Sequence, residues 1–367
     1  MIADLKVNKT QTKQSQIAEF IREKILAGNL KENSRLPSTQ ALSKEWDMPE
    51  ATVHRALALL VKEGLLTRKP KMGTIVTPRN NKLSSIAVYV QQDLLHPISD
   101  FMQLLVGFID QELKKRHIEC RIFIESNEGS SFHQVSEMAE KKLIQGVIVP
   151  MINPSLYSEI KKLPVPFSCI TSAKIKNRVP HYDKSFMDMS AEAFKKMNCK
   201  KIALLSSIRD FDDPINSGER EQHEFHAYFR EVFQSNGFEI RDEWIRTHEK
   251  EFLTNMEANH FAFDAFHKIW QCQDKPDGLL VYTEDLINGT LLAIMDEQIQ
   301  IPNDLKLVMH HNKENTLLCP VPCFFVESNI HKMALNLIGL IVDQFSGKEL
   351  TYRKQSYVLT QHHGRKK

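Results

Sequence analysis

The sequence has few cysteines, few glycines and no long apolar run, and each scarcity excludes a class of protein. Six cysteines in 367 residues, with no CxxC pair and no Cys/His comb, indicate neither a disulfide framework nor a metal site. Thirteen glycines and fifteen prolines are too few for a fibrous or low-complexity chain. No apolar stretch approaches the roughly 18 residues that span a bilayer, and the polar N-terminus lacks a signal-peptide core. We therefore expect a cytoplasmic protein without a membrane partner.

Local signatures of common enzyme classes are also missing. The chain has no GxGxxG, no GxxxxGK[ST], no HExxH and no GxSxG, so dinucleotide, P-loop, zinc-protease and serine-hydrolase chemistries lack their motifs. We accordingly predict no catalytic residue, no cofactor and no enzymatic activity.

Charge is distributed unevenly along the chain. The length of 367 residues favours two or three domains. Residues 1–80 hold 14 Lys and Arg against 8 Asp and Glu, a balance of +6, whereas residues 81–367 hold 34 against 38, a balance of −4. A basic module on a mildly acidic body suggests different partners for the two parts, with nucleic acid the leading candidate for the basic end. The alternative is a basic surface that is merely solvated.

The basic module has the pattern of three helices and a hairpin. Apolar residues recur at helical spacing over 14–26, and Ser38 is placed to cap a short second helix. After a three-residue break, a third amphipathic helix runs to Gly64, which predicts a helix-turn-helix. Two short strands, 65–68 and 74–77, flank a basic tip and predict a β-hairpin wing.

These residues resemble the GntR-type winged helix-turn-helix regulators over about 12–78. The shared landmarks are Leu36-Pro37-Ser38, Leu42, Thr52-Val53, Ala56-Leu57, Leu60, Gly64-Leu65 and Gly73-Thr74. The resemblance implies that the third helix enters the major groove, that the second helix holds phosphates, and that the wing probes the minor groove. It places DNA contacts at the polar positions of these elements, with Thr52 and His54 the preferred candidates. The full set is Arg35, Ser38, Thr39, Gln40, Glu50, Thr52, His54, Arg55, Arg68, Lys69, Lys71 and Gly73.

Two of these positions depart from the family pattern. Gln40 and the pair Pro49-Glu50 stand where many relatives carry arginine, which predicts weaker phosphate binding. Glutamate can accept from cytosine and glutamine can pair with adenine, so the choice of DNA sequence is expected to differ from that of relatives. Alternatively, Glu50 only stabilises the N-terminus of the third helix through the helix dipole.

The rest of the chain alternates strands and helices after a short polar linker. We predict a head over 1–78, a linker over 79–84 and a body over 85–367, with two α/β halves at about 85–185 and 186–310 and a C-terminal crossover. Ligands collect beyond the carboxyl ends of strands in such sheets, so two facing halves form a ligand cleft. The predicted strands are 86–90, 121–124, 146–149, 167–170, 201–205, 278–282 and 305–309.

This body is similar to the LacI/GalR-type effector domain, itself built like periplasmic sugar-binding proteins, over about 85–360. The stretch 276–308, with Pro276-Asp277, Gly289 and Ile301-Pro302, carries the most specific match. The expected fold is therefore an α+β winged helix-turn-helix head joined to an α/β two-subdomain periplasmic-binding-protein-like body. A GntR-type head on such a body resembles the arabinose-type repressors, which implies a homodimer on a double-stranded DNA operator that is released when a sugar occupies the cleft.

Strand ends and the loops after them supply the candidate effector residues. Planar polar groups and aromatic faces suit a carbohydrate. The candidates are Gln91, Gln92, Asp93, His96, Phe101, Asp183, Ser185, Arg220, Tyr282, Thr283, Glu284, Asp285 and His311.

Departures around this site leave the effector open. Met309 to Asn312 replace a Gly-aromatic-Asp-Asp run typical of relatives, and Glu284 stands where Asp is usual, so the ligand is expected to be atypical or acidic. The alternatives are that His310 and His311 lie on the surface and that Glu284 caps the following helix. A metal at the two histidines lacks a third ligand at useful spacing.

Together these patterns predict a sequence-specific DNA-binding regulator, a repressor, whose operator affinity a small molecule controls. The alternative is a regulator whose body only dimerises or binds a ligand other than a sugar. One candidate dimer face is the helix expected over 98–113.

Overall fold

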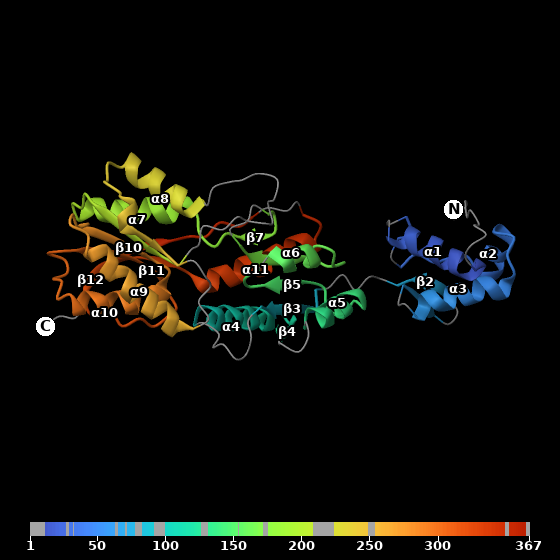
Figure 1. Ribbon diagram of the computed structural model, residues 1–367. Helices are drawn as coiled ribbons and strands as arrows, with labels where there is room; N and C mark the ends of the chain where they lie inside the picture. The colour runs from blue at the N-terminus through green and yellow to red at the C-terminus, as the bar shows by residue number, and fades with distance from the viewer. Residues whose placement is uncertain are drawn as a thin grey trace. The chain divides into compact units, whose positions relative to one another are not determined.

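The computed structural model shows two compact units, Met1–Lys82 (the head) and Leu83–Lys367 (the body) (Figure 1). In the described part of the chain, no helix combines the length and the apolar character needed to cross a membrane. The residues described are 12–26, 29–31, 33–62, 65–69, 72–77, 83–91, 100–125, 131–152, 154–171, 175–207, 224–248, 254–348 and 352–364.

The head contains the predicted helix-turn-helix. Its helices are α1 (Lys13–Leu26), α2 (Thr39–Glu45) and α3 (Glu50–Lys62). The prediction that Ser38 caps α2 is confirmed, because its hydroxyl accepts from the backbone N–H of Ala41 at 3.1 Å. Apolar faces of the three helices build one small core, which fixes the angle at which α3 presents its other face. That core includes Ile17, Ile21, Leu42, Val53, Ala56, Leu57 and Leu60.

The wing hairpin forms as predicted, with each strand shifted by one residue. Strands β1 (Leu66–Lys69) and β2 (Gly73–Val76) pair antiparallel, with Lys69 opposite Gly73. Arg35 extends the pairing through an antiparallel bridge to Ile75. Tip residues 70 and 71 lie outside the described residues, as do the predicted helix end at Gly64 and linker residues 79–82.

The first sheet of the body is entirely parallel and lies between two helical layers (Figure 1). Its order is β4-β3-β5-β6-β7. Helices α4 (Asp100–Lys115) and α11 (Ile330–Phe345) cover one face, and α5 (Phe132–Glu140) and α6 (Pro154–Ile160) lie against the other. The strands are β3 (Ser85–Val90), β4 (Glu119–Ile124), β5 (Val147–Val149), β6 (Phe167–Ile170) and β7 (Arg178–Val179).

The second sheet has the order β13-β12-β11-β10-β8-β9, with only β13 antiparallel to its neighbour. Helices α7 (Lys184–Lys196) and α8 (Glu224–Ser235) cover one face, and α9 (Asn255–Trp270) and α10 (Ile287–Asp296) cover the other. Short 3-10 turns η2 (Asp242–Trp244) and η3 (Glu284–Leu286) precede β9 and α10. The strands are β8 (Ile202–Ser206), β9 (Ile245–Thr247), β10 (Gly278–Tyr282), β11 (Lys306–Asn312), β12 (Pro322–Ser328) and β13 (Val358–His363).

The chain crosses between the two sheets after residue 310, so the predicted end of the second half is too early. β12 extends the second sheet, α11 then packs on the first, and β13 returns to the second as its edge. The helix expected over 98–113 is α4, and its role as a dimer face stays a prediction. Met102, Leu105 and Ile109 pack against β3 and α11 inside the body, so this apolar stripe belongs to the core.

Candidate DNA-binding and effector sites

Helix α3 has one buried face and one polar face. Val53, Ala56 and Leu57 are fully buried, whereas Glu50, His54 and Arg55 are exposed on the other side of the same helix. Thr52 is half-buried beside them. The head core therefore leaves α3 with a row of hydrogen-bonding side chains directed at solvent, as a helix that reads base edges requires.

A side-chain contact ties this polar face to the wing. Nη1 of Arg68, on β1, lies 3.0 Å from Nε2 of His54, on α3. Because a guanidinium only donates, Nε2 of His54 accepts and its proton is on Nδ1. The contact fixes the orientation of the imidazole and brings a wing cation next to it. Sequence reasoning nominated both residues but did not pair them.

Gly73 and Arg35 lie against each other close to the tip of the wing. Gly73 has φ +82°, a conformation that suits glycine, and a Cβ there would lie 3.2 Å from Nε of Arg35. The guanidinium of Arg35 thus lies over the wing backbone, while the side chain stays exposed. Of the other nominated residues, Ser38, Gln40 and Lys69 are exposed, Thr39 is half-buried, and Lys71 lies outside the described residues.

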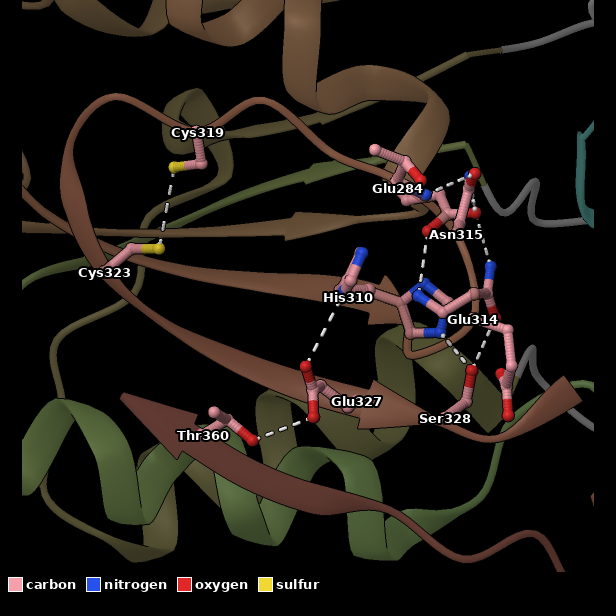
Figure 2. A network of polar contacts seen from close by, with 12 residues as sticks. Glu284, His310, Glu314, Asn315, Cys319, Cys323, Glu327, Ser328 and Thr360 are labelled. Atoms are coloured by element: carbon pink, nitrogen blue, oxygen red, sulfur yellow. Dashed lines mark hydrogen bonds and ion pairs between the residues drawn. The ribbon is translucent and has the colours of Figure 1, made fainter. Parts of the chain in front are cut away.

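In the body, a carboxylate at the carboxyl end of β10 organises the loop after β11 (Figure 2). Glu284 accepts hydrogen bonds from the backbone N–H of Asn312 at 2.8 Å, from its Nδ2 at 2.6 Å and from Nδ2 of Asn315 at 3.0 Å. The alternative that Glu284 caps α10 is wrong, since the residue before α10 is Leu286, which makes no side-chain cap. Glu284 instead holds two donors of Asn312, the last residue of β11, and one of Asn315, in the loop that follows.

The two adjacent histidines point to opposite faces of the second sheet, and neither is a surface residue. His310, 6% exposed, packs against Tyr282 and Phe186, and burial lowers its pKa to about 3. His311 packs on Phe325 and lies 3.4 Å from the Glu327 carboxylate.

The Oγ of Ser328 donates to Asn312 and therefore accepts from Nε2 of His310 at 3.2 Å. Within the described residues, Nδ1 of His310 has no hydrogen-bond partner. The neutral imidazole thus keeps one buried acceptor unused.

A second polar cluster lies next to Glu284 at the same sheet edge. The hydroxyls of Ser207 and Thr283 lie 2.8 Å apart, and Thr283 donates to Asp285 at 3.1 Å. The side chain of Asp285 is partly exposed. Desolvation by the surrounding protein nevertheless raises its pKa to about 6, with smaller contributions from the negative charges of Glu284 and Asp100. Asp100 is the first residue of α4.

Other nominated effector residues have structural contacts. Asp183 caps α7 by accepting from the backbone N–H of Ser185 at 2.9 Å and from its hydroxyl. Tyr282 is 1% exposed, its ring packs on Phe186, and its hydroxyl donates to the carbonyl of His181 at 3.2 Å. In this structure its ring is part of the core and does not line an open surface. Phe101 and Gln91 are half-buried, and Gln92, Asp93, His96 and Arg220 lie outside the described residues.

Replacing Glu284 by alanine is expected to destabilise the body. The substitution removes the acceptor of three hydrogen bonds, two of which are donated by asparagine side chains. Hydrogen bonds to a charged group contribute roughly 1.5–3 kcal/mol each, and the contributions of neighbouring bonds do not add fully. We expect Glu284→Ala to lower the free energy of unfolding by about 3 kcal/mol in urea denaturation. Asp285→Ala is the matched control and should change it by less than about 1 kcal/mol. Equal effects of the two substitutions would contradict the network.

Comparisons with known proteins give a consistent result for both units. Residues 13–76 match the gntR family of bacterial regulatory proteins, and residues 191–365 match the periplasmic binding protein-like domain. The arabinose metabolism transcriptional repressor of Halalkalibacterium halodurans is 20% identical over 344 residues, 90% of this chain and 89% of that protein. Catabolite control protein A of Priestia megaterium is 23% identical over 193 residues, which cover 51% of this chain and 54%, about half, of that protein.

A solved LacI family transcription regulator from Clostridium acetobutylicum has the same fold as the body. It superposes with a TM-score of 0.57 at 18% identity, covering 75% of this chain and 98% of that chain. The family matches and the fold of the body are those of transcriptional regulators. Within that class, the chain combines a helix-turn-helix domain that matches the gntR family with a domain that matches the periplasmic binding protein-like model and has the fold of a LacI family regulator.

Proposed function

We propose that this protein is a cytoplasmic, homodimeric repressor that binds a DNA operator through α3 and the wing and releases it when a small molecule binds the body. The observation that carries the proposal is the exposed polar face of α3 next to the wing, tied to it by the contact between Arg68 and His54. A second copy of the head provides the second half-site, as expected for dimers on near-palindromic operators.

The effector site is proposed at the carboxyl ends of β8, β10 and β11, around Ser207, Thr283 and Asp285. Carboxylate and hydroxyl groups there suit the hydroxyls of a sugar or sugar derivative. A relative of similar length is named for arabinose metabolism, which supports testing pentoses first. By linkage, a ligand that favours release must bind the DNA-bound form less tightly, with a coupling of typically about 1–3 kcal/mol.

Thermal unfolding with a panel of pentoses, hexoses, disaccharides, uronic acids and sugar phosphates tests the effector site. A ligand at about 100 times its dissociation constant stabilises the native state by roughly 2.7 kcal/mol, so we expect one sugar class to raise the unfolding midpoint. Asp285→Ala should abolish that shift and leave the midpoint without sugar nearly unchanged. Absence of any shift would favour the second candidate, a body that only dimerises or binds a different kind of molecule.

A further inference from the structure

Two buried thiols lie together at the far end of the loop that Glu284 holds. Cys319, in the loop between β11 and β12, and Cys323, in β12, are 7% and 4% exposed, and their Sγ atoms are 3.9 Å apart (Figure 2). The thiols of Cys169, Cys199 and Cys272 also donate to backbone carbonyls, but these contacts include no second sulfur. The chain therefore contains one close thiol pair among these contacts.

The two sulfurs are in van der Waals contact, so that a small movement would bring them to bonding distance. A disulfide has its sulfurs about 2.05 Å apart, so an approach of roughly 2 Å completes the bond. Two contacts hold Cys319: its thiol donates to the carbonyl of Val321 at 3.4 Å, and Nε2 of His362 donates to the carbonyl of Cys319 at 2.8 Å. Both cysteines are thus positioned for reaction with each other.

The environment also distinguishes which sulfur reacts first. The hydrogen bond from the Cys323 thiol lowers the pKa of Cys319 below that of an ordinary thiol. Burial, in contrast, raises the pKa of Cys169 to about 12 and that of Cys199 to about 12. Because the thiolate is the nucleophile, Cys319 is the thiol best suited to attack an oxidant.

We propose that Cys319 and Cys323 form a redox site that hydrogen peroxide converts to an intramolecular disulfide. The Cys319 thiolate attacks one peroxide oxygen, the O–O bond breaks, and the departing hydroxide takes up a proton to become water. Cys319 is then a sulfenic acid. The sulfur of Cys323 attacks the Cys319 sulfur, the S–O bond breaks, and a second water leaves with the Cys323 proton. Two thiols are oxidised and one peroxide is reduced to two waters.

Oxidation changes the loop that reaches the proposed effector site. The end of β11 and the loop after it supply Asn312 and Asn315 to Glu284, and Figure 2 shows the loop continuing from Asn315 to Cys319. Drawing Cys319 toward β12 therefore displaces a segment anchored at Glu284. The regulatory meaning of this coupling rests on the proposed function, whereas the formation of the disulfide does not. In reducing compartments, reversible disulfides commonly serve as redox sensors.

The chemistry is tested on the full-length protein with hydrogen peroxide, maleimide labelling and tryptic mass mapping. Both cysteines fall in one tryptic peptide, residues 314–332. After oxidation, we expect this peptide to carry neither maleimide label and to be lighter by two hydrogens than the reduced, unlabelled peptide. The peptides with Cys169 and Cys199 should stay labelled. A thiol reductant should restore labelling of both cysteines in the 314–332 peptide. In Cys323→Ser, dimedone should trap a sulfenic acid on Cys319, whereas Cys319→Ser should give no adduct at Cys323. Persistent double labelling of the peptide in the wild type would overturn the proposal.

Hydrogen–deuterium exchange tests the coupling separately. We expect oxidation to change exchange over residues 312–318 in the wild type and to leave it unchanged in Cys319→Ser/Cys323→Ser. Unchanged exchange in an oxidised wild type would overturn the link to Glu284. Failure of the sugar panel, with the disulfide still formed, would overturn the effector site alone.

Discussion

Reversing the charges of Lys69 and Lys71 together is expected to weaken operator binding on the order of 100-fold and to lower the slope of log affinity against log salt by about 2. Both lysines belong to the wing, and the side chain of Lys69 is exposed at the end of β1. Each cation that contacts a phosphate releases a counterion, so loss of both contacts reduces the affinity and its salt dependence together. Fluorescence anisotropy over a salt series measures both quantities.

Lys161 and Lys162 offer a matched control for this experiment. They are exposed in the body, and reversing their charges changes the net charge of the chain by the same amount. We expect this control to keep the wild-type slope. Equal slopes for the wing variant and the wild type would show that the wing does not contact phosphates.

Replacing Gly289 by alanine is expected to lower the free energy of unfolding by about 3 kcal/mol. Gly289, in α10, packs directly on the backbone of α9, where an added Cβ would lie 2.1 Å from the carbonyl oxygen of Asn259 and 2.9 Å from the Cβ of Ala262. A backbone oxygen cannot rotate away as a side chain can, so the two helices must separate. The packing of α9 on α10 would be lost in part.

Gly107 is the matched control, because it is also a helical glycine but is exposed on α4 with no atom within 4 Å of an added Cβ. Gly107→Ala should raise the free energy of unfolding by up to about 1 kcal/mol through helix propensity. Urea denaturation of both variants separates propensity from packing. A Gly289→Ala protein as stable as the wild type would mean that α9 and α10 are not in close contact.

Much of the fold could be predicted because its strands are buried apolar runs. Segments such as 86–90 and 278–282 became β3 and β10 with little change. β13 was not predicted, since its sequence VLTQHH has only exposed and half-buried positions at a sheet edge and carries little apolar signal. β12 was missed as well, and with it the extension of the second sheet beyond residue 310.

Only those candidate-site residues that a short stretch of sequence specifies could be predicted. The rule that ligands gather at strand ends nominated Thr283, Glu284 and Asp285, which follow directly after β10 in the structure; their role in binding stays a prediction. The same rule applies to the carboxyl end of β8, but Ser207, which follows that strand, was not predicted as a site residue. The roles of Asn312 and Asn315 depend on pairings with Glu284 that no local pattern specifies.

The most direct test measures DNA binding by the full-length protein, using duplex sites selected from a random library, with and without the sugar that raises its unfolding midpoint. We expect an enriched inverted repeat and a sugar-dependent loss of affinity of roughly 5- to 150-fold. An enriched repeat whose affinity no ligand alters would contradict control by the body. Selection that enriches no sequence would contradict operator recognition by α3 and the wing.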